Sequence, residues 1–225
     1  MKNPNQCAVY YGTFHAPVKP HIIQRSLAMK MLHHAFSAFF GTELQENGIK
    51  QDKNGKPCYV YLPNCFFNIS HCSTAVAVAV AHAPVGVDIE SPRTVKPGAV
   101  RKCCNASELS YIFDAPFSRI SLQEDLTPEQ AKRFLNLWTL KESYVKMTGD
   151  GLRIPFDTVC FDIPKFQRIN QNILRWTQPG QYQSYLYSQK NTVISLTLQQ
   201  KSTAASPQIQ WNSYPGEVIA TGECI

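Results

Sequence analysis

A single long amphipathic helix is the feature that most constrains this fold, and the sequence predicts it over residues 127–151, TPEQAKRFLNLWTLKESYVKMTGDG. Thr127 is a good N-cap, Pro128 suits the first helical position, and Gln130 completes a capping box. Gly149 marks the stop at the other end. Apolar residues recur at helical spacing between these ends and form one stripe, which consists of Ala131, Phe134, Leu135, Trp138 and Val145.

One acid, Glu142, lies on this apolar stripe, one turn after Trp138 and one turn before Lys146. A carboxylate on a core-facing stripe is costly unless a cation or hydrogen-bond donors hold it. The alternative is an ordinary solvated Glu142–Lys146 pair at i, i+4, a spacing that is common on surface helices. The helix alone leaves both interpretations open.

The composition indicates an ordinary globular protein. A chain of 225 residues with 44% hydrophobic and 17% charged residues can bury one large core or two small ones. Its net charge of +6 suits an anionic substrate or an acidic partner. It has no arginine-rich tract and no basic stripe with interleaved aromatics, so we expect no nucleic-acid partner. The longest weakly polar run, residues 74–81, is too short to span a bilayer, so we expect no membrane association.

The eight cysteines predict neither a zinc site nor a disulfide framework. No two of them form a C-x-x-C pair. The N-terminus lacks a charged leader followed by an apolar run. We therefore expect reduced thiols in a cytoplasmic protein.

Helical and strand patterns alternate along the chain, which predicts an α+β fold with a break near residue 100. Besides the long helix, helices are expected over residues 21–41 and 97–104 and from residue 105. Strands are expected over residues 7–14, 58–62, 66–71, 74–81, 85–90, 152–155, 158–163, 173–177, 182–188 and 192–199. Residues 200–225 are expected to form a loosely ordered tail with at most one more strand.

The strand VGVDIE places two acids on one face. In a strand, Val87 and Ile89 face one side, whereas Gly86, Asp88 and Glu90 face the other. Two carboxylates at i, i+2 repel each other unless a cation lies between them, and magnesium needs only a few carboxylates because it retains waters. Gly86 is expected to leave room for a ligand near the backbone. A solvent-facing acidic strand end stays the alternative, because D-x-E alone has low specificity.

Four motifs of this chain follow one another in a recognisable order. They are Gly55-Lys56-Pro57, FNISH from residue 67, GVDIE from residue 86, and WTLKESYVK from residue 138. The series resembles the 4′-phosphopantetheinyl transferases, specifically the group that activates surfactin synthetase. The most specific part is G-[IV]-D-x-E followed about fifty residues later by W-[ST]-x-K-E-[AS]-x-x-K, and the resemblance runs from about residue 25 to residue 152.

The resemblance implies an enzyme that moves the phosphopantetheine arm of coenzyme A to a serine of an apo carrier protein, acyl or peptidyl. The carrier serine attacks one phosphorus of the coenzyme A pyrophosphate and expels 3′,5′-ADP, with Mg²⁺ as cofactor. Larger members of the family fold as a pseudo-dimer of two similar α+β halves with the active site between them. Here the halves would be residues 1–100 and 101–225 of a monomer.

The resemblance also assigns the residues of the reacting centre. Asp88, Glu90 and Glu142 would hold magnesium against the pyrophosphate. Glu142, or a water that it orients, is the candidate base for the serine hydroxyl, and whether it is base, ligand or both stays open. Lys146 would contact the phosphates and stabilise the departing oxygen, and Lys141 is a lesser candidate for the same anion.

A second set of residues is expected to contact the nucleotide of coenzyme A and its phosphates. These are Arg25, Lys56, Ser70 and His71, with Lys53 as an addition. Arginine suits bidentate phosphate recognition and lysine supplies a point charge. Taken alone, Arg25 is also compatible with a solvated helix residue, and a lone histidine after a strand is usually structural.

Two other classes of protein compete with the transferase interpretation. A binding module could hold coenzyme A or a carrier without transfer, but the chain carries Lys146 and all three carboxylates that the resemblance assigns to the metal. A magnesium-dependent nucleotide hydrolase is the other, but the chain has no G-x-x-x-x-G-K-[ST] loop. The sequence does not identify which carrier is served: that of fatty-acid, polyketide or peptide synthesis.

Overall fold

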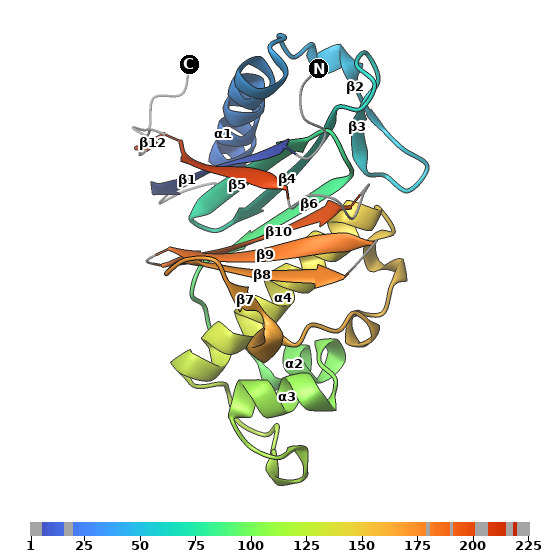
Figure 1. The fold of residues 1–225 in the computed structure, drawn as a ribbon. Coiled ribbons are helices and arrows are strands. Elements are labelled where there is room, and N and C mark those ends of the chain that lie inside the picture. The colour runs from blue at the N-terminus through green and yellow to red at the C-terminus, as the bar shows by residue number, and fades with distance from the viewer. Residues whose placement is uncertain are drawn as a thin grey trace.

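Two β-sheets stacked face to face form the centre of the molecule in the computed structural model (Figure 1). The structure describes residues 6–15, 20–178, 181–189, 191–200, 207–214 and 218–219. Helix α1 covers the outer face of the first sheet, and α4 covers the outer face of the second, with α2 and α3 beyond it (Figure 1). The mixture of helices and sheets confirms the α+β class. None of the described helices has the length and apolar character needed to cross a bilayer.

The helices are α1 (Pro20–Ala35), α2 (Pro97–Cys103), α3 (Ala106–Phe113) and α4 (Pro128–Thr148). The first sheet has the order β11-β1-β5-β4, with β12 also paired to β1, and the second has the order β6-β10-β9-β8-β7. The first sheet consists of β1 (Gln6–His15), β4 (Phe66–Cys72), β5 (Ala75–Ala81), β11 (Gln208–Ser213) and β12 (Val218–Ile219). The second consists of β6 (Val85–Glu90), β7 (Gln167–Arg168), β8 (Ile173–Gln178), β9 (Tyr182–Gln189) and β10 (Thr192–Gln199). A separate hairpin joins β2 (Ile49–Gln51) to β3 (Pro57–Tyr59).

The alternating sequence of β5, AVAVAVA, explains how the first sheet is buried on both faces. Its valines pack in the same core as α1, and its alanines pack against the second sheet. Small alanines let the two sheets approach closely, and Val87 and Ile89 of β6 fill the space opposite them. The predicted alternation of β6 is thus confirmed, with its valines and isoleucine in the core between the sheets.

Helix α4 has the boundaries that its capping signals predicted. Thr127 and Gln130 form the capping box, and Gly149 ends the helix in the left-handed conformation that glycine tolerates best. Four members of the predicted apolar stripe are buried, and Trp138 is half-buried and stacks on Phe156 at 5.2 Å between ring centroids. The helix also contacts β10 through a buried hydroxyl pair, Thr139–Ser195 at 2.7 Å.

Each sheet contains strands from both the first and the last part of the chain. Strand β6 precedes residue 100 but pairs with β10, and β11 comes from the last part of the chain but pairs in parallel with β1. The sheets therefore do not divide the chain at residue 100. The tail also holds two strands, β11 and β12, where at most one was expected.

Four expected strands and helices differ from those in the structure. No strands form at 152–155 and 158–163, where the chain makes short 3₁₀ turns at Gly151–Arg153, Phe156–Thr158 and Ile163–Lys165. The prolines at 155 and 164 disfavour a central strand, and side chains from elsewhere satisfy this backbone. The strand expected at 58–62 ends at Tyr59, and the helix expected over 21–41 changes after Ala35 into a π-helical turn that Gly41 terminates.

Candidate functional site

The close packing of α4 on β6 builds the site, and Gly86 is the residue that permits it. A β-carbon at this position would overlap the backbone oxygen of Ser143 and the backbone nitrogen of Met147. Glycine is required here because the helix backbone itself fills the space over the strand. The expectation that Gly86 leaves room for a ligand is therefore wrong. Its role is to bring the acids of β6 under the basic and acidic side chains of α4.

Asp88 lies at the centre of a hydrogen-bonded cluster that joins three elements. Its Oδ1 accepts hydrogen bonds from Ser70 Oγ of β4 and from Lys146 Nζ of α4, both at 2.6 Å. Lys146 also donates to Ser70 Oγ at 2.9 Å. The Asp88 side chain is only 7% exposed, and its second oxygen, Oδ2, is buried without a hydrogen-bond partner among the described residues. A buried carboxylate oxygen without a donor is costly, so it marks a place for a ligand.

Glu142 approaches the same cluster from α4. Its carboxylate lies 4.0 Å from Lys146 Nζ, and its side chain is 20% exposed. Burial raises the pKa of Glu142, the Lys146 ammonium opposes this shift, and the charges of Asp88 and Glu90 add to it. The three acids that the sequence singled out are thus close enough to repel one another, although they come from two elements.

Glu90 has a partner that the sequence did not indicate. Arg93 holds its carboxylate with two nitrogens, Nη2 at 3.2 Å from Oε1 and Nε at 3.3 Å from Oε2. Arg93 follows the end of β6 by three residues and is 46% exposed, whereas Glu90 is 15% exposed. An arginine three residues after the acid was the only available signal, and that spacing is too common to be specific.

These acids suit a hard divalent cation. Magnesium is bound by one or two carboxylates together with waters and substrate phosphates, and Asp88 Oδ2 offers an oxygen that no donor occupies. Within the described ranges, no three His, Cys, Asp or Glu side chains are already gathered as a metal-binding group. In this arrangement Lys146 supplies the positive charge beside Asp88 and Arg93 supplies it beside Glu90.

Lys56 reaches the end of α4 from the turn between β2 and β3. Asp52 Oδ1 accepts hydrogen bonds from the backbone nitrogens of Asn54 and Lys56, which fixes the turn. Lys56 Nζ then donates to the carbonyls of Met147 at 2.9 Å and Val85 at 3.3 Å. Burial lowers the pKa of Lys56 to about 8. Its ammonium therefore caps the helix terminus and faces the same groove as Glu142.

A groove of about 310 Å³ connects these groups. Lys56, Glu142 and Lys146 line it, together with Asn68 and Ile69 of β4. It brings together one acid and two lysines that were expected to act together, and they come from two separate motifs of the sequence. Such a lining of paired cations beside a carboxylate suits a phosphate ligand that carries a cation.

The remaining nucleotide candidates are not among the residues that line this groove. Arg25, Lys53 and His71 are exposed. Strand alternation sends His71 to the face of β4 opposite Ser70. Gln24 Nε2 donates to the Cys72 carbonyl at 2.7 Å and so attaches α1 to the end of β4 next to His71. The roles of these three residues stay predictions.

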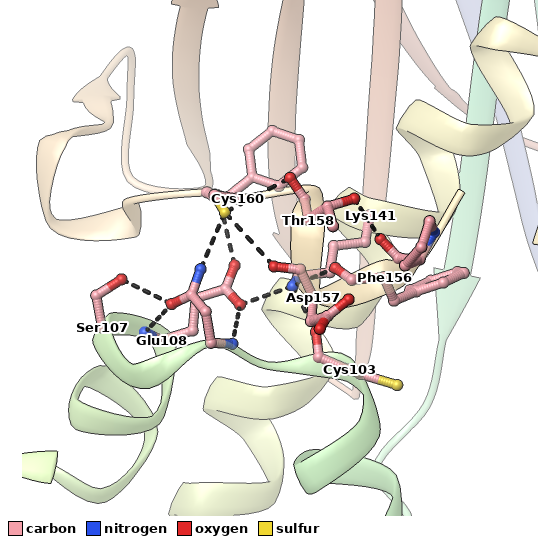
Figure 2. A network of polar contacts seen from close by, with 11 residues as sticks. Cys103, Ser107, Glu108, Lys141, Phe156, Asp157, Thr158 and Cys160 are labelled. Carbon is pink, nitrogen blue, oxygen red and sulfur yellow. Dashed lines mark hydrogen bonds and ion pairs between the residues drawn. The ribbon is translucent and has the colours of Figure 1, made fainter.

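Lys141 does not reach the groove, and the expectation that it binds an anion is wrong. Its Nζ donates to Glu108 Oε2 at 2.6 Å, to the Phe156 carbonyl at 2.8 Å and to the Cys103 carbonyl at 2.5 Å (Figure 2). An ammonium has three donors, so all are used. Both charged side chains are 1% exposed. Lys141 therefore holds α4, α3 and the turn at Phe156 together.

Comparison with known proteins identifies relatives of this chain. The family model described as the 4′-phosphopantetheinyl transferase superfamily matches residues 84–204, just over half of the chain. A 4′-phosphopantetheinyl transferase of Bacillus subtilis is 36% identical over 104 residues, which are 46% of this chain and 42% of the relative.

Two further relatives give a similar picture. The 4′-phosphopantetheinyl transferase ffp of Bacillus subtilis is 34% identical over 116 residues, which are 52% of this chain and 47% of the relative. The 4′-phosphopantetheinyl transferase gsp of Aneurinibacillus migulanus is 31% identical over 120 residues, 53% of this chain and 46% of the relative. The chain thus matches a little less than half the length of each of these relatives.

Proposed function

This chain belongs to the 4′-phosphopantetheinyl transferase superfamily, and from that premise we propose that it transfers the 4′-phosphopantetheine arm of coenzyme A to a serine of an apo carrier protein. The observation that carries the proposal is the cluster around Asp88. Its Oδ1 is held by Ser70 and Lys146, while its Oδ2 is buried beside Glu142 and has no hydrogen-bond partner among the residues that the structure describes. Such an arrangement presents one free carboxylate oxygen to a cation and fixes the other.

The residues of the groove would share the work of the reaction. The serine oxygen forms a bond to the phosphorus that bears pantetheine, the bond from that phosphorus to the bridging oxygen breaks, and 3′,5′-ADP leaves with the electron pair. Lys146 supports this oxygen with its positive charge. Glu142 takes the serine proton, directly or through a water, and its raised pKa brings it closer to the range in which a carboxylate is an effective base.

Magnesium would be held by Asp88, Glu90 and Glu142 and would neutralise the charge of the diphosphate. Lys56 would contact a phosphate with the one ammonium proton that its two carbonyl partners leave free. Ser70 would orient Asp88 and Lys146, since it bonds both. Arg25, Lys53 and His71 are proposed to contact the nucleotide from the edge of the site.

The proposal includes the arrangement of the chain as two similar halves. The two similar halves are proposed as two sheet-and-helix layers, the first sheet with α1 and the second sheet with α4, and β6 from residues 1–100 pairs into the second sheet. The groove is lined by β4, by the turn between β2 and β3, and by α4. A monomeric state, a cytoplasmic location and the absence of a nucleic-acid partner stay predictions from the sequence.

Intact-protein mass spectrometry of apo carrier proteins tests the proposal. With coenzyme A and Mg²⁺, at least one carrier from a panel of fatty-acid, polyketide and peptide-synthetase carriers should gain one phosphopantetheine mass, and EDTA should prevent the gain. Glu142→Gln should lower kcat/KM by about 10²–10⁴-fold because it removes the base. Glu129→Gln is the matched control, since Glu129 is an exposed acid on the same helix. No gain with any carrier, while coenzyme A still binds, would favour a binding module instead.

A further inference from the structure

Arg93 occupies a position from which it can act on the proposed cation site without contacting substrate. It lines a groove of about 690 Å³ together with Glu90, Leu126, Lys132 and Leu135. Its guanidinium is the contact that the structure gives the Glu90 carboxylate. The same residue therefore faces both a proposed cation ligand and an open surface.

The contact between Arg93 and Glu90 has the features of an exchangeable pair. Its two distances, 3.2 and 3.3 Å, exceed those of a tight charge-assisted hydrogen bond, whereas Lys146 and Asp88 meet at 2.6 Å. Arg93 is nearly half-exposed, and ion pairs in such a setting contribute little to stability.

The charges around Asp88 and Glu142 supply the reason for exchange. Three acids interact there, and among the described residues Lys146 and Arg93 are the cations that contact them. Asp88 Oδ2, in a side chain more than nine-tenths buried, has no donor in the described part of the chain. A divalent cation that binds this oxygen and Glu90 must compete with Arg93 for the Glu90 carboxylate.

We propose that Arg93 is a positioning residue that holds Glu90 in the cation-free chain and is released into the adjoining groove when a divalent cation binds. The inference rests on the proposed function, because that function supplies the cation. Arg93 thereby reduces the repulsion among the acids before binding, and its guanidinium becomes available at the groove afterwards. Binding of a cation by the acids thus adds the positive charge of Arg93 to the groove of about 690 Å³.

Direct measurement of Mn²⁺ binding tests the competition. Free Mn²⁺ is followed by electron paramagnetic resonance for the wild-type chain and for Arg93→Gln, Arg93→Lys and Lys96→Gln. Removal of the competitor should lower the Mn²⁺ dissociation constant about two- to fivefold in Arg93→Gln. Arg93→Lys should give an intermediate value because it keeps the charge and loses the two-point contact. Lys96→Gln removes one positive charge from the same segment, where Lys96 pairs with exposed Asp125, and should leave Mn²⁺ affinity unchanged.

A second readout follows the guanidinium itself. Phenylglyoxal, which modifies accessible arginines, should react faster with Arg93 of the wild-type chain when Mn²⁺ is present, as measured on the peptide by mass spectrometry. Mn²⁺ affinity that is equal or weaker in Arg93→Gln, or a modification rate that Mn²⁺ does not change, would overturn the inference. In that case carrier modification by the wild-type chain would still support the proposed function. A wild-type chain that binds Mn²⁺ as predicted but modifies no carrier would overturn the proposed function and keep the competition.

Discussion

Replacement of Lys141 by methionine should destabilise the protein strongly, because it removes one partner of a fully buried ion pair. Methionine preserves most of the side-chain length but leaves the Glu108 carboxylate without its cation. The two carbonyls of Cys103 and Phe156 lose the same donor. The perturbation is thus confined to the cluster drawn in Figure 2.

The size of the effect follows from the burial of the pair. Both side chains are 1% exposed, and removal of one partner from such a pair costs about 3–5 kcal/mol. For a domain of this size, that loss lowers the melting temperature by about 6–20 °C. Glu108 also accepts hydrogen bonds from the backbone nitrogens of Asn105 and Phe161, which still stabilise its charge in the variant. We therefore expect a loss of stability near the lower end of this range.

Urea unfolding followed by circular dichroism measures this cost. Lys132→Met is the control because it removes an exposed lysine from the same helix. The double variant Lys141→Met with Glu108→Gln should recover part of the loss, since no buried charge then lacks a partner. The structural role of Lys141 is refuted if Lys141→Met unfolds within about 1 kcal/mol of wild type. If that stable variant also bound coenzyme A more weakly, the result would favour the anion-binding role of Lys141 that the sequence predicted.

Three further predictions concern the groove. Gly86→Ala should lower the free energy of unfolding in urea by about 1–3 kcal/mol or more, because its methyl group meets the α4 backbone. Gly98→Ala is the control, since its methyl group enters open space and should not destabilise the protein. Equal stability of the two variants would contradict the packing of α4 on β6. The pKa of Lys56 is about 8 in the folded chain and 10.5 in the unfolded reference, so the folded state binds fewer protons and wild-type stability should rise between these values. Lys56→Met should lack this rise, and parallel pH profiles would refute the burial of the ammonium. Burial and two neighbouring acids raise the pKa of Glu142 above its ordinary value of 4.5. The folded state therefore holds this proton to a higher pH than the unfolded state, and stability falls as pH rises from 4.5 through the raised pKa. Glu142→Gln should therefore melt higher than wild type at pH 7, and a lower melting temperature would contradict the repulsion among the acids.

The parts of the fold that the sequence predicts well are those set by local rules. Helix α4 begins and ends where its capping box and terminal glycine indicate, because these residues satisfy the backbone groups next to them. Strand β6 alternates as expected because its side chains have two fixed faces. Asp88 and Lys146 meet because Gly86 allows these two elements to touch.

The errors arise where distant side chains decide the outcome. The apolar residues between 152 and 163 resemble strands, but Lys141 and Glu108 bind their backbone and favour turns. The motif that contains Lys141 places it one residue before Glu142, and only the packing shows that the two point to different surroundings. Arg93 escaped notice because an exposed arginine near an acid has no distinctive local pattern.

The central claim is that Asp88, Glu90 and Glu142 meet at one divalent ion that holds a diphosphate. Crystals of the protein grown with coenzyme A and Mn²⁺, measured at the manganese absorption edge, test it most directly. The account predicts one anomalous peak within bonding distance of Asp88 Oδ2, the carboxylates of Glu90 and Glu142, and an oxygen of the coenzyme A diphosphate. A peak away from these carboxylates, with Asp88 Oδ2 still without a ligand, would contradict it.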